Sequence, residues 1–159
     1  MNNRVFKIIS IVLLLLCLVT IFLFSSENSD ESDETSIKVT KEVITAVGGN
    51  NVDNNEVHKI AINYDRLARK VAHFIEYLCL GILSINVIAC YKRINYKWLI
   101  ICFIFCILYS VSDEVHQLYV PGRSCEFKDI LVDSIGSFIG IMIYYLVYRG
   151  KKGSKLVMK

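Results

Sequence analysis

Four long apolar blocks dominate this 159-residue chain, and they constrain its fold more than any other feature. A helix needs about 20 residues, within a range of about 17–25, to cross the hydrocarbon core of a bilayer. Hydrophobic residues make up 54% of the chain, too many for an ordinary water-soluble domain. We therefore predict an all-α membrane protein, one domain over residues 1–159, with transmembrane helices at about 6–25, 70–91, 97–117 and 129–148.

The first block, Ile8–Phe24, carries no charge and follows Arg4 and Lys7, so it also has features of a signal peptide. The residues that follow it, 24–27, match a small-x-small cleavage site poorly. We therefore expect this block to remain in the protein as its first membrane helix.

Basic residues are concentrated in three segments: the N-terminus, the connection after the second block, and the C-terminal tail. These segments hold ten of the eighteen Lys and Arg residues and no acid. The positive-inside rule therefore places all three, including both termini, in the cytoplasm. Residues 25–66 and the connection near Val120 then face outward. The ten basic residues are Arg4, Lys7, Lys92, Arg93, Lys97, Arg149, Lys151, Lys152, Lys155 and Lys159.

The outer segment 25–66 contains two kinds of sequence. It begins with the acidic, serine-rich run SSENSDESDETS, which we expect to be a flexible spacer. Apolar residues then recur at helical spacing over 37–47, and again over 57–71 after a Gly-Gly-Asn-Asn break. We predict one or two short interfacial helices, the second running directly into the membrane block that follows.

The six cysteines do not form a disulfide framework. Five lie within the apolar blocks, where Cys behaves as a small apolar residue. Only Cys125 lies in an outer connection, and it has no evident partner there, so we predict no disulfide.

Charged side chains share one face at the start of the second block. Arg69, His73 and Glu76 are spaced i, i+4 and i+7, and Lys70 adjoins them. Glu76 lies five residues beyond Val71, about 7.5 Å deeper at about 1.5 Å per residue. An ionisable group at that depth is costly and normally faces the bundle interior with a partner.

The third block ends in a similar polar group. Asp113, His116 and Gln117 share a helix face by the same spacing, and Glu114 lies beside it. The sequence Pro121-Gly122 suits the centre of a type II turn, because Pro fixes one φ and Gly supplies the positive one. That turn would hold the next residue, an arginine, over the helix ends.

The fourth block carries one narrow stripe at i, i+4, i+7 and i+11, formed by Asp129, Asp133, Gly136 and Gly140. Its deeper half, GSFIG, is a small-xxx-small pattern that permits close helix packing. We predict that Gly136 and Gly140 pack against a helix of the same chain and that the two aspartates point inward.

All three polar groups lie at outer helix ends, so we predict that they share a depth and form one outer pocket. The ligand-binding candidates are Arg69, Lys70, Gln117, Arg123, Asp129 and Asp133. The catalytic or metal-ligating candidates are His73, Glu76, Asp113 and His116.

Three functions fit this set of residues. The cations can hold a phosphate while a histidine and a carboxylate act as acid and base. Imidazole and carboxylate ligands also suit a divalent metal such as zinc, as in a metal-assisted hydrolase or transferase acting on a lipid-linked phosphate. Alternatively, the charges pair between helices in a structural or regulatory membrane subunit. No recognised zinc signature, Ser-His-Asp set or glycine-rich phosphate loop is present, so no particular enzyme activity is predicted.

The segments RKVAHFIEYLCLGIL and SDEVHQLYVPGRSCEFKDILVDSIGSFIG resemble the VanZ-like family of small bacterial membrane proteins. The resemblance covers residues 67–143 well and the first helix more loosely. The matching positions are Arg69, Lys70, His73, Glu76, Tyr77, Asp113, Glu114, His116, Gln117, Pro121, Gly122, Arg123, Asp129, Asp133, Gly136 and Gly140.

This resemblance implies a multi-pass protein of the bacterial cytoplasmic membrane. The family is named for a protein associated with resistance to the glycopeptide teicoplanin, so it also implies a role in the cell envelope or in antibiotic resistance. It identifies no reaction. The partners we expect are the lipid bilayer and a lipid-linked or cell-wall component that contains phosphate, and not nucleic acid.

Overall fold

The computed structural model describes residues 3–48, 54–123 and 125–157, and this part of the chain contains five helices and no strand. The predicted all-α class is therefore confirmed. The helices are α1 (Asn3–Ser26), α2 (Ser29–Gly48), α3 (Asn54–Tyr91), α4 (Tyr96–Gln117) and α5 (Phe127–Val157).

Within the described part of the chain, four helices are long and apolar enough to cross a membrane, as predicted. The candidate spans are Arg4–Ser26, Leu67–Tyr91, Tyr96–Gln117 and Phe127–Gly150. The third span reaches Gln117 and so includes the polar residues at the end of α4.

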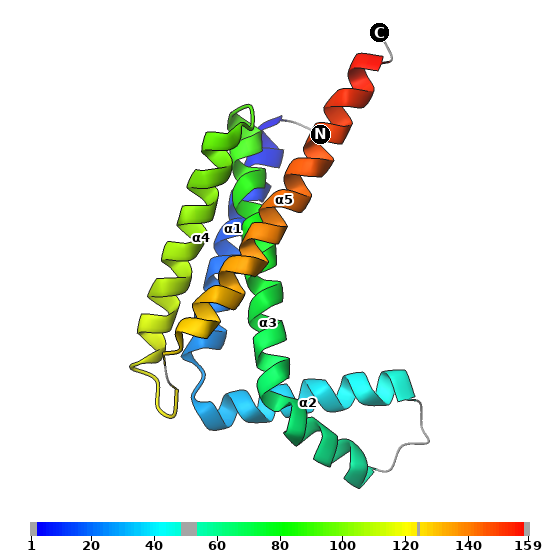
Figure 1. The fold of residues 1–159 in the computed structure, drawn as a ribbon, viewed down its shortest axis with the longest axis vertical. Coiled ribbons are helices and arrows are strands. Elements are labelled where there is room, and N and C mark those ends of the chain that lie inside the picture. Colours follow the sequence, from blue (N-terminus) through cyan, green and yellow to red (C-terminus); the bar gives the residue numbers. More distant parts are fainter. Residues whose placement is uncertain (1–2, 49–53, 124, 158–159) are drawn as a thin grey trace.

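The four spans lie side by side in a bundle, and α2 crosses one end of it (Figure 1). α3 packs against each of the other four helices, and its interface with α5 is the most extensive. We call the end that α2 crosses the polar end; there α1 and α4 finish and α5 begins. The opposite end, which carries the connection 92–95, is the basic end.

Helix α2 corrects the expected flexible spacer, and helix α3 extends the second predicted interfacial helix. The acidic run was expected to be flexible, but helix α2 begins within it at Ser29. The second periodic segment forms the first part of α3, so the interfacial and membrane portions are one 38-residue helix.

Glycines allow the close approach of α3 and α5. A Cβ atom added at Gly140 would lie closer than 3.0 Å to the backbone carbonyl oxygen of Leu78, and one at Gly136 would lie 2.6 Å from that of Phe74. From the other side, a Cβ at Gly81 would collide with the backbone of Ser137. No larger residue fits at these positions without moving the helix backbones apart.

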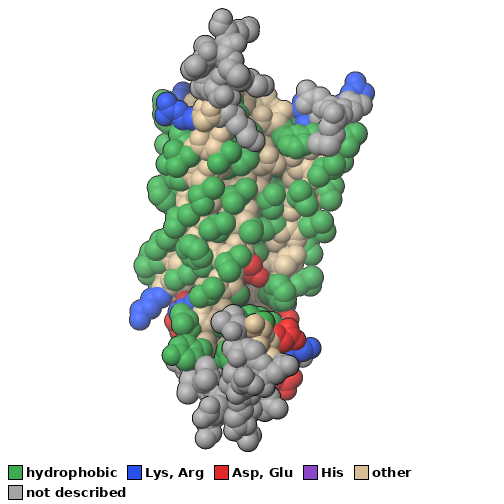
Figure 2. All heavy atoms as spheres, turned by 90° about the vertical axis from the view of Figure 1, so that its right-hand side faces the viewer, with side chains coloured by type: hydrophobic (Ala, Val, Ile, Leu, Met, Phe, Trp, Pro, Cys, Tyr) green, Lys and Arg blue, Asp and Glu red, His purple; other side chains and the backbone are tan. Residues whose placement is uncertain are grey.

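Large apolar side chains cover the sides of the bundle (Figure 2). Exposed examples come from every membrane helix, such as Leu16, Ile75, Leu108 and Ile135. In water so wide an apolar surface would drive association, whereas lipid tails solvate it. The charged side chains lie toward the two ends of this surface (Figure 2).

A polar network near the basic end joins α1, α3 and α5, and it was not predicted from the sequence. The Asn86 side-chain amide donates to the Ser10 hydroxyl at 3.1 Å, and the Tyr144 hydroxyl donates to the Asn86 side-chain oxygen at 3.0 Å. The thiol of Cys90 also approaches the Ser10 hydroxyl, at 3.5 Å. These side chains satisfy one another, so the network fixes how the three helices meet.

We expect Gly140→Ala to destabilise the bundle, because its Cβ would meet the Leu78 backbone. Overpacking of this kind costs roughly 1–3 kcal/mol. The free energy of unfolding, measured by SDS titration of the protein in mixed micelles, should fall by that amount. The matched control is Gly150→Ala, where nothing lies within 4 Å of the added atom. Equal stability of the two variants would contradict the tight α3–α5 contact.

Candidate functional site

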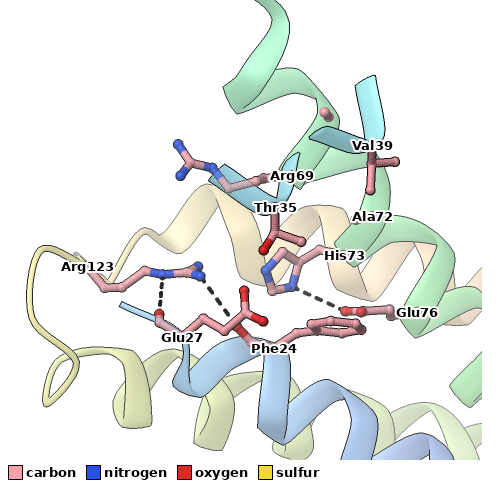
Figure 3. A pocket seen from close by; sticks show the side chains of 10 residues that line it. Phe24, Glu27, Thr35, Val39, Arg69, Ala72, His73, Glu76 and Arg123 are labelled. Atoms are coloured by element: carbon pink, nitrogen blue, oxygen red, sulfur yellow. Dashed lines mark hydrogen bonds and ion pairs between the residues drawn. The ribbon is translucent and has the colours of Figure 1, made fainter. Parts of the chain in front are cut away.

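A cavity of about 180 Å³ lies at the polar end, between the end of α1, helix α2, helix α3 and the turn after α4 (Figure 3). It contains charged groups of both signs and an apolar wall. Its lining residues are Phe24, Glu27, Thr35, Val39, Ala68, Arg69, Ala72, His73, Glu76 and Arg123.

α3 supplies half of the lining, and helical spacing explains why. Arg69, His73 and Glu76 fall on one face, and the small side chains of Ala68 and Ala72 beside them leave room for the cavity. The His73 Nδ1 atom lies 4.0 Å from the Glu76 Oε2 atom, too far for a hydrogen bond (Figure 3). Both side chains are mostly buried, and the His73 Nδ1 atom has no hydrogen-bond partner among the described residues.

Arg123 reaches the cavity from the connection between α4 and α5. Gly122 has the positive φ that its place in the predicted turn requires, at 76°, and the Arg123 backbone N–H donates to the Val120 carbonyl at 3.2 Å. The Arg123 guanidinium donates to the backbone carbonyls of Glu27 at 3.2 Å and Phe24 at 3.4 Å (Figure 3). It therefore caps the C-terminal end of α1, where carbonyls lack partners within the helix. These two bonds use two of its five N–H donors.

Six lining residues were not predicted, and two of them, Ala68 and Ala72, belong to α3. Phe24 and Glu27 come from the end of α1, and Thr35 and Val39 from α2. The carboxylate of Glu27 lies close enough to that of Glu76 for the two charges to repel each other. Likewise, Arg69 lies close enough to Arg123 for their positive charges to interact. The helical spacing over 37–47 predicted a helix here but did not show that it crosses the bundle end.

A second polar group is buried away from the cavity, around α4. The Ser110 hydroxyl donates to the Asp133 carboxylate at 2.7 Å, and the Gln117 amide approaches the Asp113 carboxylate at 3.5 Å. Asp133 is fully buried, and its second oxygen has no hydrogen-bond partner among the described residues. Neither aspartate lines the cavity.

Glu114 and Lys70 stabilise the start of α5. The buried Glu114 carboxylate accepts a hydrogen bond from the Glu126 backbone N–H at 2.9 Å, just before α5 begins. The Lys70 ammonium group lies 2.5 Å from the Asp129 carboxylate and 3.6 Å from that of Glu126, which ties α3 to α5. These contacts account for Lys70 and Asp129 without a ligand.

His116 faces α1 rather than the cavity. Its ring stacks on that of Phe22 with centroids 4.7 Å apart, and its Nε2 atom lies 3.0 Å from the Ser26 hydroxyl. His116 is therefore separated from His73, which lines the cavity with Glu76.

The polar residues predicted to share one pocket thus fall into two sets. Arg69, His73, Glu76 and Arg123 meet at the cavity, whereas Lys70, Asp113, His116, Gln117, Asp129 and Asp133 do not line it. The separation arises because the residues of α4 and α5 point into helix contacts, a direction that spacing along one helix does not reveal.

The arrangement also bears on the metal ligands considered above. The part of the chain that the structure describes holds no group of three or more His, Cys, Asp or Glu side chains arranged to bind a metal ion. His73 and Glu76 are two adjacent potential ligands, but structural zinc sites use four protein ligands and catalytic sites three. The described residues therefore do not form the zinc site that this hypothesis requires.

Comparison with known proteins identifies a family for this chain. The model of the family described as VanZ/LLP1 matches residues 10–148 of the chain. The matched region contains all four candidate spans in whole or in large part, together with every described residue of the cavity. No curated protein and no solved structure matches the chain.

We expect Ser110→Ala to destabilise the folded protein, because it removes the hydrogen-bond donor to the buried Asp133 carboxylate. Leaving such a group unsatisfied costs roughly 1–3 kcal/mol. The free energy of unfolding in mixed micelles measures this effect. Ser112→Ala on the same helix is the control, because Ser112 is exposed and donates only to its own helix backbone. A loss no larger for Ser110→Ala than for this control would show that Asp133 does not depend on Ser110.

Proposed function

The chain belongs to the VanZ/LLP1 family, and from this premise we propose that its cavity binds a phosphate-containing component of the bacterial cell envelope. Two arginines line the cavity, Arg69 from α3 and Arg123 from the α4–α5 connection. Guanidinium groups form paired, charge-assisted hydrogen bonds with phosphate oxygens, and Arg123 retains donors for them. This convergence of two arginines from distant parts of the chain is the observation that carries the proposal.

The proximity of the two arginines favours an anionic group in the cavity. Like charges close together repel more strongly in a partly buried site than in water, and a bound phosphate would relieve that repulsion. His73 adds a buried nitrogen without a partner among the described residues, which can donate to the same phosphate or exchange a proton with it.

We further propose that the polar end faces outward from the bacterial cytoplasmic membrane. The connection 92–97 and both ends of the chain carry the basic residues that the positive-inside rule assigns to the cytoplasm. The cavity would then lie at the outer leaflet, where lipid-linked cell-wall components are exposed. Its occupancy would alter how glycopeptides of the teicoplanin type reach their target, and so contribute to resistance.

The structural-subunit hypothesis accounts for one part of the polar residues. Lys70 with Asp129 and Ser110 with Asp133 join helices, so these residues have roles without any ligand. It does not account for His73 and Glu76, which line an open volume. The metal-assisted enzyme lacks support from the described residues, since they form no three-ligand group.

The outward orientation predicts that Cys125 reacts with a membrane-impermeant maleimide added to intact cells. Cys125 lies in the α4–α5 connection at the polar end and is exposed. The experiment uses a variant with the other five cysteines changed to Ala or Ser, and a second variant with one cysteine at Lys92, on the basic end, in place of Cys125. Labelling of the Lys92→Cys variant alone would reverse the proposed orientation.

The phosphate site predicts weaker binding when an arginine of the cavity is replaced. In full-length protein purified in detergent, Arg69→Gln and Arg123→Gln should each weaken binding of dihexanoyl phosphatidic acid roughly tenfold or more, because each removes a charge-assisted hydrogen bond. Isothermal titration calorimetry measures the affinity. Arg93→Gln, at the basic end, should bind as the original chain does.

The same variants test the proposed role in cells. Expressed in a susceptible host, the original chain and Arg93→Gln should raise the inhibitory concentration of teicoplanin, whereas the two cavity variants should not at equal membrane level. If folded variants of both cavity arginines bind phosphatidic acid and act in cells as the original chain does, the phosphate proposal is wrong.

A further inference from the structure

The cavity contains carboxylates as well as guanidinium groups, and a phosphate alone does not explain them. Glu27 and Glu76 both line it, alongside Arg69 and Arg123. With His73 neutral, two positive and two negative side chains give the lining a formal charge of zero. A simple anion would therefore leave the occupied cavity with a net negative charge and would meet two repelling carboxylates.

Among the residues that the structure describes, neither carboxylate pairs with the side chain of a lysine or arginine. The His73 ring lies 4.0 Å from the Glu76 carboxylate. Arg123 contacts Glu27, but through the backbone carbonyl rather than the carboxylate. A partly buried carboxylate without a cation is costly, so a positive group in the cavity would stabilise both.

Building on the proposed function, we propose that the occupant is zwitterionic: a phosphodiester and a primary ammonium group joined by a short linker. The phosphate would pair with Arg69 and Arg123, and the ammonium group with Glu27 and Glu76. Such a ligand satisfies both signs of charge and adds no net charge to the cavity. An ammonium group with three N–H donors can also serve two carboxylates at once.

The surroundings indicate that this group is the head of a membrane lipid. Phe24, Val39, Ala68 and Ala72 give the cavity an apolar wall. Phe24 belongs to the candidate span Arg4–Ser26, and Ala68 and Ala72 to Leu67–Tyr91, so the cavity lies where two membrane spans reach the interface. A lipid could leave its acyl chains in the bilayer beside these helices while its head group enters.

The experiment compares three water-soluble probes with full-length protein in detergent by isothermal titration calorimetry. They are dihexanoyl phosphatidylethanolamine, which carries phosphate, ammonium and chains; dihexanoyl phosphatidic acid, which lacks the ammonium group; and O-phosphoethanolamine, which lacks the chains. We expect the first to bind about tenfold tighter than either of the others, since paired charged hydrogen bonds are worth about that factor.

Substitutions then assign the preference to the carboxylates. Glu76→Gln and Glu27→Gln should each reduce the preference for phosphatidylethanolamine over phosphatidic acid to within about threefold, while binding of phosphatidic acid is kept or strengthened. Retained phosphatidic acid binding also shows that the variants are folded. Glu126→Gln is the matched control, because Glu126 lies outside the cavity, and it should keep the full preference.

The outcomes separate this inference from the proposed function. If phosphatidic acid binds as tightly as phosphatidylethanolamine and the Glu variants change nothing, the zwitterionic ligand is wrong but the phosphate site stands. If O-phosphoethanolamine binds as tightly as the lipid, the lipid assignment is wrong. If none of the probes binds, both the inference and the phosphate site fail.

Discussion

Helices α3 and α5 pack against each other through their backbones, and this contact holds the one helix that touches all the others. Backbone atoms of the two helices approach so nearly at Gly81, Gly136 and Gly140 that no side chain fits between them. The contact fixes the depth of α3, and α3 in turn packs against every other helix. Phe74 and Leu78, which meet the two glycines of α5, lie beside the cavity residues Ala72, His73 and Glu76 along α3, so the same contact also positions the cavity face of α3.

Polar residues near one membrane interface serve two separate purposes in this chain. One set is enclosed between helices, where Ser110 meets Asp133 and Glu114 accepts from the backbone that leads into α5. The other set lines an open volume, where the buried His73 Nδ1 atom has no hydrogen-bond partner among the described residues. A sequence pattern cannot separate them, because burial in a helix contact and burial in a cavity both favour the same residue types. The two sets are distinguished only by whether a helix face points into a helix contact or into the cavity.

The sequence predicted the helices and part of the site, for physical reasons that can be named. Block length and hydropathy are properties of a single helix, so the four spans could be predicted from the sequence. The spacing of Arg69, His73 and Glu76 correctly placed them together, and Pro121-Gly122 correctly indicated the turn that positions Arg123. The contribution of Glu27 and Thr35 to the cavity lining could not be predicted from the sequence, because it depends on how α2 crosses the bundle. The orientation of His116 likewise depends on α1, which supplies both Phe22 and Ser26. Ser26 lies 90 residues before His116 in the chain, so spacing along α4 cannot reveal this contact.

The hydrogen bond from Arg123 to Glu27 spans 96 positions of the chain. It closes a ring that begins at the end of the first membrane helix and ends after the third. The cavity therefore has no complete wall until three helices are in the membrane and the turn after α4 has formed. As ribosomes deliver helices to the membrane in order, a head group could not be held in this place by the first half of the chain. Recognition would thus begin late in biosynthesis, when α5 is about to pack against α3 and complete the bundle.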